Sequence, residues 1–442
     1  MRVGGGVFVS SPLEWSLVEG PIPVALTVVS ALLVIVLSWT RRARWWTRAV
    51  PICVAVAVAV TMGLRWVIED VAAPFPDRLP WSLYGWVGLT VLTVALAVAR
   101  VGSARWTGRV LLAFGMVLSV VIGAAKVNEF FDQYTTLRAV LGPLVSPQAD
   151  FASVRGKDGW LVRSGRGKPL ADVWHAPVGM PDRGAVSTVE IPSSGGFGPR
   201  SAWLYLPPAY LVSPRAELPV LVLLSGQPGT TRDWLDGGHL ADMLDDFARA
   251  HQGLAPVVVM PDILGSYAAN PLCLDSRLGQ VETYLAKDVP AWIQRSLAVT
   301  DDHRRWAVGG FSLGGTCSLQ LAVRAPEVYR SFVDLSGQRE PTLGGHEQTV
   351  AAAFGGDQAA FARVNPLDIL AAAKFPGSAG FVAVGRQDET YRPQQRTVSE
   401  ACRAAGMDVR YEEVDGGHSW KAWRPAFQRA LPWLATKTEL TG

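Results

Sequence analysis

Apolar residues form four long runs without charge in the first third of the chain, at 20–40, 49–64, 79–99 and 110–125. A helix needs about 20 apolar residues to cross a bilayer core of roughly 30 Å. The first and third runs reach this length. The second and fourth reach it with their flanking residues, which would place Arg65 and Lys126 at the headgroups. Four such runs separated by short connections predict an all-α, four-helix transmembrane domain over residues 1–127.

The charges in the connections predict how these helices are oriented. The first and third connections are rich in arginine, whereas the second is acidic on balance. Short loops rich in lysine and arginine stay in the cytoplasm. Both ends of the bundle, and everything after Lys126, should therefore lie outside the cytoplasm. No aspartate or glutamate lies in the middle of a run, so the bundle reads as an anchor and not as a transporter.

Beyond the bundle the pattern of apolar positions changes twice. Residues 128–185 show weak periodicity and predict a linker or stalk, with a short helix near 129–141. Residues 186–442 alternate strand-like and helix-like spacing, which is typical of a mostly parallel sheet covered by helices on both faces. The expected strands are 187–191, 202–206, 220–224, 257–260, 306–308, 331–335, 380–384 and 409–414, and the expected helices are 236–251, 283–297, 318–324, 393–405 and 423–434.

Composition narrows the class of protein further. Of 442 residues, 49% are hydrophobic and only 18% are charged, which excludes a disordered chain. The formal net charge is +3, which gives no indication of nucleic-acid binding. Four cysteines are too few for a disulfide scaffold. The sequence has no H-E-x-x-H, Walker A or C-x-x-C motif, so we expect no metal and no cofactor.

A candidate nucleophile lies in the segment Gly310-Phe311-Ser312-Leu313-Gly314, which matches G-x-S-x-G. The segment falls between an expected strand and an expected helix, which is the context that a nucleophile elbow requires. In such a turn the Ser312 hydroxyl stands exposed at the sheet edge. The backbone N–H of Leu313 then becomes one donor to a developing oxyanion.

A serine nucleophile needs a base and an acid that orients it. His418 lies in a Gly-Gly-His-Ser-Trp loop between the last expected strand and the last helix, so it is the candidate base. The acid should follow a strand between these two residues. Asp388 is our choice, and Glu389 is the alternative because a shift of one residue in the loop would exchange them.

The second oxyanion donor should come from the loop Ser225-Gly226-Gln227-Pro228-Gly229, which follows the strand 220–224. Proline has no N–H. Gln227 is therefore the expected backbone donor.

Five segments carry a resemblance to a known family: RSAWLYLPPAYL, LPVLVLLSGQPG, SRLGQVETYLAKDVPAWI, GGFSLGGTCS and GGHSWKAWRPAFQRALPWL. Their series resembles the esterase family of α/β-hydrolases that includes esterase D-type enzymes and the antigen 85 mycolyltransferases. The resemblance covers about 186–434 and implies a Ser312–Asp388–His418 triad with oxyanion donors from Leu313 and Gln227. Antigen 85-like members use a glutamate as the acid, so Glu389 remains a candidate for this role. In esterase D-type members the first residue of the oxyanion loop is often a histidine. This chain has Ser225 at that position.

Two cysteines are expected to lie near this site. Cys317 is on the expected elbow helix, and Cys273 precedes a loop that should pack near it, so a Cys273–Cys317 disulfide is expected, with three buried thiols as the alternative.

Together these features predict a membrane-anchored serine esterase that acts on lipid or cell-envelope esters outside the cytoplasm. The expected partners are the lipid bilayer and an acyl-ester or glycolipid substrate, and the oligomeric state is open. The alternatives are an acyltransferase that moves an acyl chain to a sugar hydroxyl and a non-catalytic envelope-binding protein.

Overall fold

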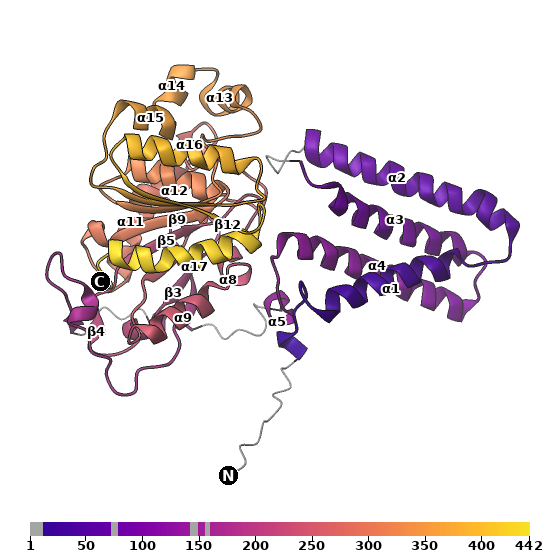
Figure 1. Ribbon diagram of the computed structural model, residues 1–442, viewed down its shortest axis with the longest axis horizontal. Helices are drawn as coiled ribbons and strands as arrows, with labels where there is room; N and C mark the ends of the chain where they lie inside the picture. Colours follow the sequence, from indigo (N-terminus) through magenta and orange to yellow (C-terminus); the bar gives the residue numbers. More distant parts are fainter. Residues whose placement is uncertain (1–11, 72–77, 142–148, 155–159) are drawn as a thin grey trace, which may run out of the picture. The chain divides into compact units, whose positions relative to one another are not determined.

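The computed structural model describes residues 12–71, 78–141, 149–154 and 160–442. The chain forms two compact units, Met1–Val145 and Ser146–Gly442 (Figure 1). The segment 128–185 is thus not the separate linker that we expected. Its first residues continue the last helix of the bundle, and Leu170 and Trp174, each 1% exposed, lie in the core of the second unit. The apolar residues of this segment follow neither helical nor strand spacing, so periodicity does not reveal their burial.

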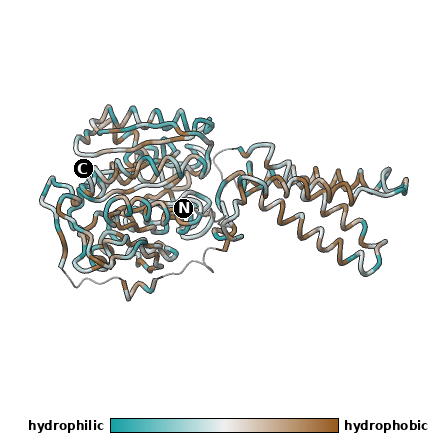
Figure 2. Tube along the Cα trace, turned by 60° about the horizontal axis from the view of Figure 1, so that its bottom comes forward, coloured by the Kyte–Doolittle hydropathy of each residue, from teal (hydrophilic) through white to brown (hydrophobic). Residues whose placement is uncertain are grey.

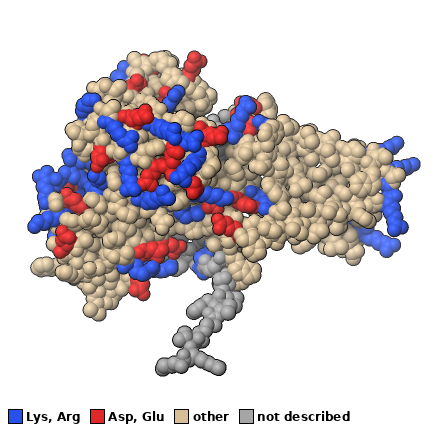
Figure 3. All heavy atoms as spheres, in the orientation of Figure 1, with Lys and Arg blue, Asp and Glu red and all other residues tan. Residues whose placement is uncertain are grey.

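Four long helices build the first unit, and each is long and apolar enough to cross a membrane. Figure 2 shows that most residues along these helices are hydrophobic. Figure 3 shows basic side chains gathered at the end of the bundle where α1 connects to α2 and α3 to α4. The helices of this unit are α1 (Pro21–Ser38), α2 (Val50–Trp66), α3 (Trp81–Val101), α4 (Trp106–Phe131) and α5 (Leu137–Val140), with π-helical turns at Trp45–Ala49 and Val67–Val71 and a 3-10 turn at Pro12–Glu14.

The Lys126 side chain is buried within the bundle and bonded there. It is 7% exposed, its ammonium donates to the Pro23 carbonyl at 3.0 Å, and it pairs with Glu129 at 2.7 Å. A buried charge is retained when it is paired and hydrogen-bonded. Lys126 therefore joins α4 to the start of α1, and its place at the headgroups stays a prediction.

An eight-stranded sheet forms the centre of the second unit, in the order β12-β11-β10-β9-β5-β6-β3-β2. The strands from β12 to β6 are parallel, and β3 and β2 continue the sheet antiparallel. The strands are β2 (Ala185–Val189), β3 (Ala202–Leu206), β5 (Val220–Leu224), β6 (Val257–Met260), β9 (Trp306–Phe311), β10 (Ser331–Leu335), β11 (Ala379–Gly385) and β12 (Asp408–Val414), with small ladders β1 (Leu161–Val162)–β4 (Arg215–Ala216) and β7 (Asp275–Ser276)–β8 (Gly279–Gln280).

Both faces of the sheet are covered, which explains the continuous apolar runs of β5 and β6. Val220 and Val222 face one core with α11, α12, α15 and α16, whereas Leu221 and Leu223 face the other with α9 and α17. Figure 1 shows α12 and α17 on opposite sides of the strands. The helices are α7 (Phe151–Val154), α8 (Asp233–Asp236), α9 (Leu240–Ala250), α10 (Val281–Thr283), α11 (Val289–Ser296), α12 (Leu313–Arg324), α13 (His346–Phe354), α14 (Gln358–Ala362), α15 (Pro366–Ala372), α16 (Tyr391–Ala404) and α17 (Trp420–Lys437), and shorter turns are Leu170–Asp172, Pro208–Tyr210, Tyr284–Asp288 and His303–Arg305.

This architecture confirms the α/β fold expected from the alternation of strands and helices. Most expected strands agree within two residues, but β9 runs to Phe311, three residues beyond the expected end. The extra residues include Gly309 and Gly310, which have low strand propensity on their own. The three helices between 346 and 372 have nine, five and seven residues, so they are too short to show the helical period that would predict them.

Candidate active site

Ser312 is the single residue between strand β9 and helix α12. Its backbone has φ 54° and ψ −122°, a conformation that costs a residue with a side chain about 1–3 kcal/mol. A Cβ at Gly310 would overlap the backbone of Gly314, so the turn can close this tightly only with glycine. The Ser312 N–H donates to the Leu335 carbonyl of β10 at 2.8 Å, which fixes the turn to the sheet.

Three of the predicted site residues are joined by two hydrogen bonds. His418 Nε2 lies 2.9 Å from Ser312 Oγ, and His418 Nδ1 lies 2.9 Å from Asp388 Oδ2. His418 follows β12, Asp388 follows β11 and Ser312 follows β9. The carboxyl ends of parallel strands meet at one edge of the sheet, which is why residues more than 100 positions apart come together here.

The structure distinguishes between the two candidate acids. Asp388 is 3% exposed, and its other carboxylate oxygen accepts the Tyr391 N–H at 3.2 Å. Glu389 is exposed, and the contact with His418 is made by Asp388. The Asp388 carboxylate is thus held in place by the first turn of α16, while the Glu389 side chain is exposed.

Two aromatic rings that we had not predicted hold the imidazole. The Tyr391 ring stacks on His418 with centroids 4.1 Å apart, and the Trp423 ring meets it edge-on at 5.0 Å. Both come from the first turns of helices that follow the acid and the base. The helix α17 begins at Trp420, two residues after the histidine, and its first turn brings Trp423 back against the imidazole.

The loop after β5 packs closely against the elbow. A Cβ at Gly226 would come within 3.2 Å of the Ser312 Cβ, so the loop approaches the nucleophile as closely as backbone allows. In the described part of the chain, no protein acceptor is found for the backbone N–H of either Gln227 or Leu313. Both donors are therefore available for an oxygen that develops charge beside Ser312.

Several contacts fix this oxyanion loop from behind. The Gln227 side chain donates to the Ala268 carbonyl at 3.0 Å and accepts from Asn270 at 3.1 Å. Arg200 donates to the Gly229 carbonyl at 3.1 Å and pairs with the buried Asp262 at 2.6 Å. Burial opposes ionisation of Asp262, but hydrogen bonds from Arg200 outweigh it and hold the pKa of this carboxyl below its usual value. The loop is thus tied to the segment that follows β6.

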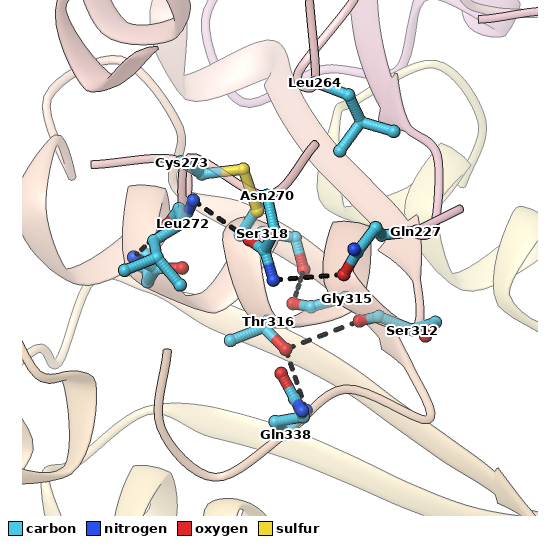
Figure 4. The surroundings of a disulfide bond; sticks show 12 residues. Gln227, Leu264, Asn270, Leu272, Cys273, Ser312, Gly315, Thr316, Ser318 and Gln338 are labelled. Atoms are coloured by element: carbon cyan, nitrogen blue, oxygen red, sulfur yellow. Dashed lines mark hydrogen bonds between the residues drawn. A yellow bond between two sulfur atoms is a disulfide. The ribbon is translucent and has the colours of Figure 1, made fainter. Parts of the chain in front are cut away.

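A disulfide joins Cys273 of that segment to Cys317 of α12 (Figure 4). Cys53 and Cys402 are free and buried. The bridge connects the elbow helix to the loop that holds Gln227 in place. Oxidation is favoured in extracytoplasmic compartments, where structural disulfides persist.

Asp334 is a fully buried carboxylate near the elbow that sequence reasoning missed. It lies at the end of β10, where its oxygens accept from the Gln395 side chain at 3.0 Å and from the Gly337 N–H at 2.8 Å. Burial raises the pKa of Asp334 to about 7, although these two hydrogen bonds lower it. Its position within an apolar strand gave no sequence signal, because strand periodicity cannot report a buried acid.

We expect the free energy of unfolding to fall as pH rises from about 4 to about 7 through Asp334. The folded state holds this proton up to about pH 7, whereas an unfolded aspartate releases it near 3.9. One pKa unit corresponds to about 1.4 kcal/mol, so the change across the window is a few kcal/mol. Thermal unfolding of wild type and Asp334→Asn at pH 5 and 8 measures it, and the variant should lack most of the pH-dependent loss. Asp408→Asn, on a side chain 69% exposed, is the control and should keep the wild-type slope. Parallel pH curves for wild type and Asp334→Asn would contradict the assignment.

The sheet order and the strand–turn–helix elbow place the second unit among the α/β-hydrolases. Residues 198–434, more than half of the chain, match the family model described as Putative esterase, and the chain belongs to this family. It is therefore a hydrolase or acyltransferase of the esterase type. Among the described residues, no group of three or more His, Cys, Asp or Glu side chains is arranged to hold a metal ion.

Relatives cover the chain to different extents. An uncharacterized protein of Corynebacterium glutamicum is 35% identical over 96% of this chain and 98% of its own length, so it shares both units. An acetyl esterase of Caldicellulosiruptor saccharolyticus is 22% identical over 50% of this chain and 84% of its own. Among solved structures, a ferulic acid esterase aligns with 58% of this chain and 99% of its own (20% identity, TM-score 0.49), and Mycobacterium tuberculosis MPT51 with 57% and 98% (17%, 0.44).

Proposed function

We propose that this protein is a membrane-anchored serine esterase whose catalytic unit lies outside the cytoplasm and cleaves acyl esters of lipids or cell-envelope glycoconjugates. The chain of hydrogen bonds from Ser312 through His418 to Asp388 is the observation that carries the proposal. An imidazole held in this way accepts the serine proton and stays oriented when it becomes cationic.

The reaction follows from the positions of these groups. His418 Nε2 takes the Ser312 proton as Oγ attacks the ester carbonyl carbon. The carbonyl oxygen becomes an oxyanion that the N–H groups of Leu313 and Gln227 stabilise, and one such donor is typically worth a factor of about 10²–10³ in kcat. His418 then gives its proton to the leaving alkoxide, which departs as the alcohol and leaves an acyl-serine. Water then attacks the acyl-serine in the same way, with His418 as the base. The carboxylic acid product leaves as Ser312 regains its proton.

The four apolar helices support the anchoring part of the proposal, and the basic connections support its sidedness. A site tethered at the outer membrane surface meets lipid and envelope esters before it meets cytoplasmic metabolites. The Cys273–Cys317 bridge favours the same side of the membrane.

Labelling with a fluorophosphonate tests the proposal. We expect wild type to be labelled at Ser312 and Ser312→Ala not to be labelled, because only an activated hydroxyl attacks phosphorus at a useful rate. Ser153→Ala, on an exposed turn, should label like wild type. A membrane-impermeant probe applied to intact cells should give the same result. Label only after lysis would contradict the sidedness, and equal label on Ser312→Ala would contradict the nucleophile.

A further inference from the structure

A cavity of about 340 Å³ lies beside the oxyanion loop, in the segment that follows β6. Leu264 and Asn270 line it, and Figure 4 shows Asn270 bonded to Gln227, with Leu264 above them and Ser312 below. The Asn270 side chain donates to the Gln227 side chain at 3.1 Å, and the Tyr267 backbone carbonyl accepts from the Gly229 N–H at 2.9 Å. The wall of the cavity and the oxyanion loop are thus one connected structure.

We infer that this cavity binds the acyl chain of the substrate, of about four to eight carbons, an inference that rests on the proposed esterase function. The order of strands in the sheet indicates the direction in which the acyl chain lies. His418 follows β12, whereas the cavity follows β6, on the other side of β9 and β5. The leaving alcohol must lie against His418 to receive its proton. The acyl chain, attached to the same carbon, projects away from His418 toward the cavity.

The chemistry of the lining favours an alkyl group over a sugar. The side chains that form its walls are apolar, with Phe197, Leu264, Pro271 and Leu278 among them. The polar side chain in the lining is Asn270, and its hydrogen-bonding groups are already used by Gln227, Thr342 and Leu272. Apart from backbone groups, a sugar in this cavity would find no free side-chain partner for its hydroxyls, whereas an alkyl group would contact the apolar side chains.

The volume limits how much of the chain lies inside the cavity. A water-sized group occupies about 30 Å³, so 340 Å³ holds roughly eleven such groups. A carbonyl with up to eight carbons fits within this number. A longer chain has to extend through the open side of the cavity, where added methylenes gain little from burial.

Gly198 offers a way to fill the cavity without disturbing the fold. It lines the cavity, and a Cβ built on it has no atom within 4 Å. Gly345, at the start of α13, has the same open surroundings and serves as the matched control. Gly198→Phe therefore adds a ring at the cavity, and Gly345→Phe adds the same ring elsewhere on the catalytic unit.

The test uses full-length protein and p-nitrophenyl esters of two, four, eight and twelve carbons. In wild type, kcat/KM should rise about tenfold or more from acetate to octanoate and not beyond. Gly198→Phe should lower kcat/KM for octanoate at least tenfold while acetate stays within about threefold, and Gly345→Phe should match wild type. An equal effect of Gly198→Phe on all chain lengths overturns the inference. A changed preference among acetyl esters of different alcohols, with the acyl preference unchanged, also overturns it.

A second readout separates this inference from the proposed function. Octanoate binding to Ser312→Ala in lipid nanodiscs, corrected for empty nanodiscs, requires no turnover. Saturable binding that is lost in Ser312→Ala/Gly198→Phe supports the cavity even if wild type fails to react with fluorophosphonate. Binding that is absent, or unchanged by the added phenylalanine, overturns it even if Ser312 is reactive.

Discussion

Replacing Asp388 by asparagine is expected to lower kcat by about 10⁴. The carboxylate accepts a hydrogen bond from His418 Nδ1 at 2.9 Å, which leaves Nε2 free to accept the Ser312 proton. An asparagine amide can donate to Nδ1 instead, and the proton then moves to Nε2, where it faces the serine. The imidazole keeps its position but can no longer act as a base. Hydrolysis of p-nitrophenyl butyrate, normalised to the folded fraction, measures the effect.

Glu389→Gln is the matched control for this variant, because it makes the same chemical change one residue away. Glu389 is exposed, whereas Asp388 is 3% exposed and bonded to the base. We expect Glu389→Gln to keep kcat within about twofold of wild type. A loss of less than tenfold in Asp388→Asn, or a large loss in Glu389→Gln, would show that the acid has been wrongly assigned.

The positions of Ser312 and His418 could be predicted because each follows from a local pattern. The G-x-S-x-G segment lies between a strand and a helix, and the histidine loop lies between the last strand and the last helix. The order of parallel strands then brings their ends to one edge. The same patterns favour Asp388 over Glu389 but leave both open. The decision depends on which carboxylate the first turn of α16 buries, and a loop of unknown conformation does not reveal that.

Other features depend on contacts between distant segments. Residues 160–185 pack into the catalytic unit through scattered side chains such as Trp174, which no period identifies. Asp334 lies in an apolar strand, and its burial under the elbow depends on the pairing of β10 with β9. Lys126 turns inward because Glu129 and the Pro23 carbonyl are within reach, and the second of these lies over 100 residues away. A sequence pattern shows which face of a helix or strand is apolar. The burial of these three side chains depends instead on the distant segments that pack against them.

Removing the Cys273–Cys317 bridge should lower the stability of the catalytic unit by about 4 kcal/mol, since it closes a loop of sequence separation 44. For a unit of this size we expect the Tm to fall by about 6 °C. The bridge also anchors a segment under backbone strain, because Leu272 and Cys273 both have positive φ. Released from α12, this segment can relax and withdraw Asn270 from Gln227. Thermal unfolding of full-length Cys273→Ala/Cys317→Ala, followed by tryptophan fluorescence, measures the loss.

The activity of the same variant tests whether the bridge also supports the oxyanion loop. With Asn270 displaced, the Gln227 N–H is less well aimed, so kcat should fall several-fold at a temperature where the variant is folded. This loss is smaller than the factor of about 10²–10³ expected when one oxyanion donor is removed altogether. Cys402→Ala is the control, since it removes a buried thiol that forms no bridge and should cost about 1 kcal/mol with kcat unchanged. Treating wild type with a reductant should reproduce the double variant. A double variant as stable as Cys402→Ala would refute the stabilising role, and unchanged kcat would separate the bridge from the oxyanion loop.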